Sequence, residues 1–385
     1  MTGYWHLGYV HTMTAARVRE HLGRPALIFV VLLVIGFVIS TGYGIARYQW
    51  RIVTARGSEF VRMWDFDALE QVLIAEAILS GKGYVVGDNA AAIEGKTVRF
   101  VGQPAVFKAP LYQYFLAGAF AISGFSFLLF FPLQALAAGG LSGLAGLVAR
   151  EAFKHPAVAW FAGLAAAVQP VLVNTASQPY NEPLFFLLFL AAIWTFLRWL
   201  DSGGVRYAVA CGCLIGLGTL TRETMLLPSA VMLVFGGVAV RRRPGATRGV
   251  AMIVATAVLV IGPWTVRNYA QLGRVVPVAT MSGTVLAIGN NECMAEEGVF
   301  TPYWGDGRKC PALSAIRSQA LARYGSQPDV ILLDPSTQRS ASSSSARIRS
   351  RTYASACNAH GVCSCHSTRA QTKALCNARR SSCTG

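Results

Sequence analysis

The sequence predicts an all-α, multi-pass membrane protein: a helical bundle of about seven transmembrane helices with a long first exoplasmic loop that carries juxtamembrane helices. Of the 385 residues, 54% are hydrophobic and only 14% are charged, whereas soluble domains carry about 25% charged residues. Apolar runs recur along the chain, and about 20 such residues are enough to cross a bilayer. The net charge of +16 then indicates cytoplasmic loops rich in Lys and Arg, and no nucleic-acid partner.

The N-terminus, residues 1–25, is predicted to be cytoplasmic. Arg17, Arg19 and Arg24 precede a first apolar stretch at residues 26–47. A signal peptide is the alternative interpretation, but this stretch is too long for a signal-peptide core and no Ala-x-Ala cleavage site follows it. We therefore expect an uncleaved first span.

Six more apolar stretches follow the first. They cover about residues 127–148, 156–175, 183–200, 207–221, 225–240 and 248–266. Two consecutive ones, 207–221 and 225–240, are short for a bilayer, so we expect the turn between them to lie below the membrane surface in a water-filled cavity. That turn carries Arg222 and Glu223.

Basic loops orient these spans. The run from Arg241 to Arg248 is the densest, and the turns at 150–154 and 198–206 are also basic, so all three are assigned to the cytoplasm. The opposite, exoplasmic face then receives residues 48–126, the turn at 180–183, Arg222 with Glu223, and the chain after Trp264. This scheme requires that residues 110–123 form a juxtamembrane or re-entrant helix. Acidic and basic side chains gather on the exoplasmic face, so we expect the chemistry there.

The first exoplasmic loop carries an acidic motif. Residues 64–70 read Trp-Asp-Phe-Asp-Ala-Leu-Glu, and a helical pattern follows, ending in Leu-Ser-Gly-Lys-Gly at 79–83. Asp65 and Asp67 beside a span end suit a general base or a cation ligand. The alternative is a solvated helix start, where acids are favoured by the helix dipole.

A cation precedes the next apolar segment. Residues 108–112 read Lys-Ala-Pro-Leu-Tyr, which brings Lys108 to the membrane interface, where it suits a lipid phosphate or simply extends toward water. Beyond the last span, residues 263–269 read Pro-Trp-Thr-Val-Arg-Asn-Tyr and residues 289–291 read Gly-Asn-Asn. Arg267 is either a site residue or a span-end anchor.

In this order the motifs resemble the GT-C glycosyltransferases, in particular bacterial relatives of protein mannosyltransferases and lipid A aminoarabinose transferases. The resemblance covers about residues 26–310 and implies a GT-C-like bundle. It includes Asn-Glu-Pro-Leu at 181–184 and Leu-Thr-Arg at 220–222. The chain departs from the family pattern where Ala68 replaces a second acid, Gln71 replaces an aromatic residue, and Ala109 replaces a proline.

The resemblance implies transfer of one sugar, with inversion, from a polyprenyl-phosphate donor to an envelope lipid, glycan or protein acceptor at the inner (plasma) membrane. Asp67 is expected to be the base, with Asp65 as the alternative. Lys108 and Arg222 are expected to contact phosphate, and Tyr112, Glu182 and Arg267 to support substrate binding. These roles are implied by the resemblance alone. No cofactor or metal ligand is assigned, although a divalent cation at the two aspartates stays open.

Domain organisation follows from the same pattern: a transmembrane module at 26–270, an exoplasmic loop at 271–312 and a disordered tail at 313–385. The tail is dense in Ser, Arg, Ala and Cys, which is typical of disorder. Its abrupt composition also raises the hypothesis of a C-terminally truncated or frameshifted, non-native end.

Other hypotheses remain beside the glycosyltransferase. One is a lipid or solute transporter, which needs polar residues deep within its spans. Another is a catalytically inactive membrane protein. A disulfide between Cys293 and Cys310 is compatible with an oxidising compartment, and Cys363, Cys365 and His366 lack the spacing of a zinc site.

Overall fold

The computed structural model of the chain describes residues 23–49, 51–64, 66–94, 101–240 and 246–280. Within these ranges all regular secondary structure is helical, and pairing of extended backbone is limited to isolated bridges. This confirms the predicted all-α class. Several predictions fall outside the described residues: those on Asp65, on the Gly-Asn-Asn motif, on Cys293 and Cys310, on the zinc-like residues and on the tail.

Four helices among the described residues are long and apolar enough to cross a membrane. They are α2 (Pro25–Tyr48), α8 (Phe127–Phe153), α11 (Glu182–Ser202) and α14 (Ala246–Leu272). They correspond to the first, second, fourth and seventh spans that the sequence predicts. The chain is therefore a multi-pass membrane protein.

The third predicted span is broken. It consists of α9 (Pro156–Ala167) and α10 (Pro170–Ala176), which meet at an angle of 54°. Pro170 starts the second segment because it lacks a backbone N–H, and the side chain of Gln169 caps that segment by accepting from the backbone of Leu172. Counting the pair as one span gives up to five spans among the described residues.

The fifth and sixth predicted spans are short helices. They are α12 (Val205–Thr221) and α13 (Leu226–Val240), joined through the 3₁₀ turn η1 (Glu223–Met225). Both are apolar but shorter than the four long helices. The expected count of about seven spans is met only if these two also cross, as the sequence interpretation supposed.

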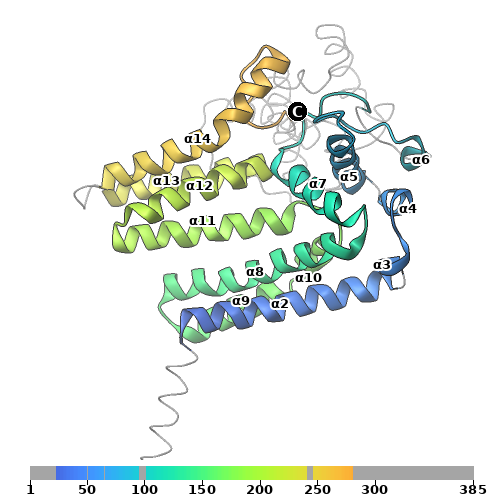
Figure 1. Cartoon of the computed structure of the whole chain (residues 1–385). Coiled ribbons are helices and arrows are strands. Elements are labelled where there is room, and N and C mark those ends of the chain that lie inside the picture. The colour runs from blue at the N-terminus through green and yellow to red at the C-terminus, as the bar shows by residue number, and fades with distance from the viewer. Residues whose placement is uncertain (1–22, 50, 65, 95–100, 241–245, 281–385) are drawn as a thin grey trace, which may run out of the picture. The chain divides into compact units, whose positions relative to one another are not determined.

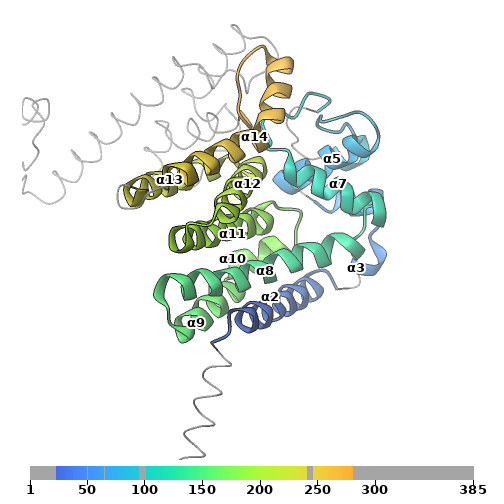
Figure 2. The same ribbon diagram turned by 60° about the vertical axis from the view of Figure 1, so that its left-hand side comes forward.

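Small residues allow the long helices to approach one another closely. A side-chain carbon added at Gly139 of α8 would overlap the backbone of Leu33 in α2, and one at Gly212 of α12 would overlap the backbone of Ile253 in α14. Helices in lipid gain little from the hydrophobic effect, so close backbone packing of this kind stabilises their association. In the bundle α8 packs between α2 and α11, and α12 packs against α11 and α14 (Figure 2).

The segment between α2 and α8 folds as short helices at one end of the bundle (Figure 1). They are α3 (Arg51–Thr54), α4 (Ser58–Arg62), α5 (Phe66–Leu79), α6 (Ala90–Ile93) and α7 (Leu111–Ser123). The same end carries the C-termini of α2 and α12 and the N-termini of α8, α11 and α13. We call it the loop end. Helix α7 matches the predicted juxtamembrane segment 110–123.

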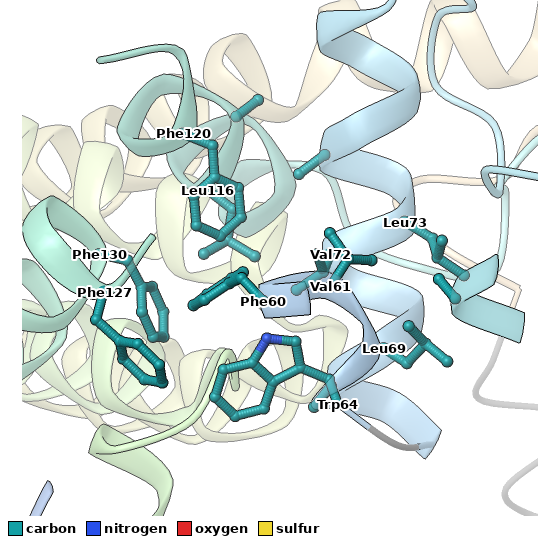
Figure 3. Close-up of a cluster of buried hydrophobic side chains, with 14 of the residues drawn as sticks. Phe60, Val61, Trp64, Leu69, Val72, Leu73, Leu116, Phe120, Phe127 and Phe130 are labelled. Atoms are coloured by element: carbon teal, nitrogen blue, oxygen red, sulfur yellow. The ribbon is translucent and has the colours of Figure 1, made fainter. Parts of the chain in front are cut away.

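An aromatic core fixes these short helices onto α8. Phe60 lies between Trp64, Phe120 and Phe127, with ring centroids 5.1–5.4 Å apart, and all four side chains are almost completely buried. Figure 3 shows the side chains converging from α4, α7 and α8, with Leu69 and Val72 of α5 beside them. This packing fixes the position of the start of α5, where Asp67 lies, at the loop end of the bundle.

Candidate functional site

The site begins with one lysine shared by two carboxylates. Lys108 Nζ lies 2.8 Å from Asp67 Oδ1 and 3.3 Å from Glu70 Oε2. Asp67 and Glu70 are three residues apart on α5 and therefore lie on one face of that helix. The side chain of Asp67 is 43% exposed, that of Glu70 only 3% and that of Lys108 11%. Lys108 thus forms ion pairs with one partly exposed carboxylate and one buried carboxylate.

Tyr84 fixes the backbone that carries Lys108. Its hydroxyl donates to the carbonyls of Lys108 and Ala109, at 3.1 and 3.2 Å. Burial raises the pKa of Tyr84 well above its ordinary value, although the positive charge of Arg267 opposes this. Tyr84 therefore remains a phenol, and a hydrogen-bond donor, throughout the physiological pH range.

A second ion pair lies at the start of α11. Arg222 Nη1 is 2.6 Å from Glu182 Oε1, and Asn181 Nδ2 donates to the carbonyl of Thr221 at 3.0 Å. The two contacts tie the C-terminus of α12 to the N-terminus of α11. Glu182 Oε2 is buried and accepts no hydrogen bond from the described residues, so it could accept one from a ligand hydroxyl.

Electrostatic effects connect the two ion pairs. Burial raises the pKa of Glu223 to about 7, opposed by the positive charges of Arg222 and Lys108. Burial also raises the pKa of Tyr180, and the negative charges of Asp67 and Glu182 raise it further. The pKa of Glu223 and the pKa of Tyr180 are therefore each shifted by one charge from either ion pair. We call the six residues Asp67, Glu70, Lys108, Glu182, Arg222 and Glu223 the polar cluster.

Among the described residues, Arg267 is linked to the polar cluster through Tyr84, which contacts the backbone of Lys108. Its guanidinium lies 4.6 Å from the ring centre of Trp264 and 5.4 Å from that of Tyr84, and it donates to the Tyr84 carbonyl at 3.4 Å. The neighbouring Asn268 is buried and donates to the carbonyls of Val276 and Val278. The Arg-Asn motif therefore holds together the segment after α14 and the loop around Tyr84.

Tyr112 lies on α7, within range of the charge of Glu182. Its side chain is completely buried, and its hydroxyl accepts from Gln134 Nε2 at 3.0 Å. Gln134 also donates to the carbonyls of Gln178 and Tyr180. Tyr112 therefore links α7 to α8 and, through Gln134, to the turn before α11.

The structure brings together most of the residues that the sequence singled out. Asp67 pairs with Lys108, and Glu182 pairs with Arg222, whereas Asp65 lies outside the described residues.

Four residues of the site received no role from the sequence: Glu70, Tyr84, Tyr180 and Glu223. Glu70 could have been found, because it lies one helical turn after Asp67 and so shares its face. Tyr84 follows the Gly-Lys-Gly motif, but nothing in the sequence indicates that its hydroxyl reaches residues 24 and 25 positions later. The places of Tyr180 and Glu223 in the site depend on contacts between helix ends that are distant in the sequence.

The described residues contain no group of three or more His, Cys, Asp or Glu side chains arranged to hold a metal ion. Asp65, one of the two aspartates considered for a divalent cation, is not among them. Within the described part, each acid in an ion pair of the polar cluster has Lys108 or Arg222 as its partner.

Comparison with known proteins gives one family. Residues 107–266 match the family described as dolichyl-phosphate-mannose-protein mannosyltransferase. The matched segment includes Lys108, Tyr112, Glu182 and Arg222, while Arg267 directly follows it and Asp67 lies 40 residues before it. No curated protein and no solved structure matches the chain.

Proposed function

We propose that this chain is a membrane glycosyltransferase of the GT-C type, which the family match over residues 107–266 supports. It transfers one sugar from a polyprenyl-phosphate donor to an envelope lipid, glycan or protein, with inversion at the anomeric carbon. The observation that carries the proposal is the pairing of an exposed carboxylate, Asp67, with a nearly buried cation, Lys108, at 2.8 Å. The reaction needs a base for the acceptor and a cation for the departing phosphate, and these two groups adjoin here.

In this mechanism Asp67 accepts the proton of the acceptor hydroxyl. The acceptor oxygen attacks the anomeric carbon from the face opposite the phosphate, so that the new carbon–oxygen bond forms as the bond to the phosphate oxygen breaks. The electron pair of the broken bond stays on that oxygen, and polyprenyl phosphate leaves. Asp67 suits the role of base because its carboxylate is partly exposed, whereas Glu70 is buried.

Lys108 and Arg222 stabilise the phosphate that leaves. Its negative charge increases as the bond breaks, and nearby cations favour that state over the ground state. The side chain of Arg222 is 42% exposed and ends α12, so it can offer a two-pronged contact to phosphate, while Lys108 provides a point charge. Glu182 orients Arg222, and its buried second oxygen is available to a sugar hydroxyl.

The membrane determines the depth at which the phosphate of the donor lies. A polyprenyl chain dissolves in the hydrocarbon and its phosphate stays at the interface, at the depth of the helix ends that carry Glu182 and Arg222. We assign this loop end to the exoplasmic face of the inner membrane, because the basic turns lie at the opposite helix ends. The acceptor then approaches from the exposed side of Asp67.

The test is sugar transfer by the purified full-length protein in detergent, with a panel of radiolabelled polyprenyl-phosphate sugars and acceptor lipids, glycans or peptides. Asp67→Asn should lower the rate by about 10²–10⁴-fold, and Lys108→Ala should weaken donor use. Lys82 and Asp88 provide matched controls, because they form an exposed ion pair on the same loop, with side chains 51% and 59% exposed. Lys82→Ala and Asp88→Asn should retain full activity.

Either of two results would contradict the proposal. One is that wild-type protein transfers no sugar from any donor. The other is that Asp67→Asn is as active as Asp88→Asn, in which case the exposed carboxylate is not the base. The donor that is turned over also identifies the sugar class.

A further inference from the structure

Arg47 is a cation at the loop end to which the proposed reaction assigns no role. It is the last residue but one of α2, and its side chain is exposed. We propose that Arg47, together with Tyr43, Tyr48 and Asn174, forms a subsite for the phosphate head group of an anionic membrane lipid. The subsite is separate from the donor-phosphate contacts, and the proposal does not depend on the sugar-transfer reaction.

Three neutral side chains hold the guanidinium of Arg47 in one orientation. Its Nη1 donates to Asn174 Oδ1 at 2.9 Å and to the Tyr43 hydroxyl at 3.2 Å, and its Nε donates to the Tyr48 hydroxyl at 3.1 Å. The guanidinium carbon also lies 5.5 Å from the centre of the Tyr48 ring. The Tyr43 hydroxyl donates in turn to Asn174 Oδ1 at 3.2 Å. The guanidinium is therefore oriented before a ligand binds, which lowers the entropic cost of binding.

The positive charge and one nitrogen of Arg47 remain available to a ligand. Within the described ranges, its hydrogen bonds use Nε and Nη1 and all go to neutral partners, whereas Nη2 carries two further N–H groups. A phosphate offers several acceptor oxygens and the opposite charge, and hydrogen bonds between arginine and phosphate are among the stronger ones in proteins. Arg47 therefore suits a phosphate group.

The surroundings of Arg47 favour a lipid over a free phosphate ion. Ile45 on α2 is 52% exposed, and Val171, one turn before Asn174 on α10, is 61% exposed. Apolar side chains that face hydrocarbon thus lie on both helices of the subsite, next to a span end, where the phosphates of lipids are found. An arginine that only anchors a span extends its side chain toward water. Arg47 is instead held by partners from two helices, as a binding group is.

The broken span supplies the second helix of the subsite. Helix α10 follows the 54° bend and packs against α2. Asn174 of α10 thereby reaches Arg47, although the two residues are 127 positions apart in the chain. The bend therefore places a polar acceptor beside the end of α2.

The subsite lies near the polar cluster but makes its own contacts. Burial raises the pKa of Tyr180, the negative charges of Asp67 and Glu182 raise it further, and the positive charge of Arg47 lowers it. Tyr180 is thus within electrostatic range of both regions. The hydrogen bonds of Arg47 among the described residues go to α2 and α10 alone. A lipid held by Arg47 therefore lies beside the candidate site, at a phosphate position distinct from that of the donor.

The test uses the full-length protein in phosphatidylcholine nanodiscs that contain a photoreactive phosphatidylglycerol, with the labelled peptides identified by mass spectrometry. Wild type should be labelled at the end of α2 and on α10, because phosphatidylglycerol lacks the choline cation that compensates the phosphate of the surrounding lipid. Arg47→Gln should raise the half-saturating concentration of this lipid at least about tenfold. Asn174→Ala keeps the charge but loosens the guanidinium, and should raise it about two- to tenfold.

Arg206→Gln is the matched control. Arg206 is exposed near the start of α12, at the opposite helix ends. It also has a neutral partner, since it donates to the Tyr207 hydroxyl at 3.3 Å and lies 4.8 Å from the centre of that ring. The variant should keep the wild-type labelling of α2 and α10. Equal half-saturation in Arg47→Gln and Arg206→Gln would overturn the proposal. If Arg47→Gln does not fold, as judged by gel filtration, wild-type half-saturation in Asn174→Ala has the same meaning.

Competition identifies the source of the phosphate. Unlabelled phosphatidylglycerol should suppress the labelling, whereas glycerol phosphate, its free head group, should not. Equal protection by both compounds would contradict a lipid ligand, because the hydrocarbon chains would then add nothing.

A further variant separates this subsite from the donor contacts. Lys108→Ala should leave the labelling of α2 and α10 unchanged. Loss of the labelling in this variant would mean that one phosphate site serves both groups, and the separate subsite would be wrong. Wild type that is labelled as expected but transfers no sugar would contradict the proposed function and leave the lipid subsite supported.

Discussion

Lys108 and Asp67 are 41 residues apart in the chain, yet their side chains form an ion pair of 2.8 Å at the loop end of the bundle. The contact joins the start of α5 to the segment before α7. It brings a base candidate and a phosphate-binding candidate into one site, and the following predictions test what the neighbouring residues contribute.

Replacing Lys108 by Ala should weaken binding of polyprenyl phosphate about tenfold to a hundredfold, because charge-assisted hydrogen bonds contribute about 1.5–3 kcal/mol. Isothermal titration in detergent measures the affinity without requiring turnover. Lys82→Ala is the control, since that lysine lies on the same loop and pairs with Asp88 in an exposed position. Equal affinity in the two variants would remove Lys108 from the phosphate site.

Glu223 should make donor use depend on pH. Its pKa is about 7 in the folded protein, against an ordinary 4.5, so its carboxyl group is neutral below pH 7 and negatively charged above it. A negative charge beside Arg222 and Lys108 competes with the donor phosphate, and donor KM should rise above pH 7. In Glu223→Gln this alkaline rise should disappear, whereas Glu94→Gln, at an exposed helix end, should retain it. Steady-state kinetics from pH 5.5 to pH 8.5, within about 1.5 units of the pKa on either side, covers the titration.

The same shift has a consequence for stability. A carboxyl group with a raised pKa binds its proton more tightly in the folded state, so its contribution lowers the free energy of unfolding as pH rises from 4.5 through about 7. Glu223→Gln should therefore raise the melting temperature at pH 8 and have little effect at pH 4. A difference that is the same at both pH values would mean that Glu223 does not titrate in this range.

Removing one partner of the Glu182–Arg222 pair should cost stability as well as activity. Arg222→Gln leaves the carboxylate of Glu182 without its 2.6 Å partner, and a cost of about 1–2 kcal/mol is expected for a partly exposed pair. The double variant Glu182→Gln/Arg222→Gln should recover much of this stability but none of the activity. Thermal melting and sugar transfer on the same preparations separate the two effects.

Close helix packing gives a stability prediction that is independent of the reaction. Gly139→Ala should destabilise the protein, because its side-chain carbon would overlap the backbone of Leu33 and overpacking costs about 1–3 kcal/mol. Gly42→Ala is the control, since open space surrounds that position on α2 and alanine favours a helix there. Melting curves in detergent should show a lower transition for the first variant only.

Much of the fold could be predicted from the sequence, because the hydrocarbon core of the membrane requires apolar helices and the cytoplasmic side favours basic turns. The helices α2, α8 and α11 begin and end within a few residues of the predicted spans. The break between α9 and α10 was not predicted, although Pro170 marks its position. That stretch is mostly apolar on both sides of Gln169, so hydrophobicity alone cannot show that the helix changes direction there.

The site was predicted less completely than the fold. Lys108 and Asp67 were found as separate motifs, since each has a distinctive local pattern. Their contact depends on the aromatic core around Phe60, which packs α5 against α7. No local sequence pattern shows this packing. The orphaned oxygen of Glu182 and the raised pKa of Glu223 depend on burial, and burial follows only from the packed structure.

If α12 crosses the bilayer, as the seven-span arrangement requires, its shortness affects the lipid around it. Seventeen residues of helix extend about 26 Å at 1.5 Å per residue, which is less than the roughly 30 Å of hydrocarbon in a bilayer. Such hydrophobic mismatch is relieved by local thinning of the bilayer. In the proposed function, lipid beside Arg222 is then drawn inward, and the polyprenyl phosphate donor reaches the guanidinium without its head group leaving the water-accessible layer.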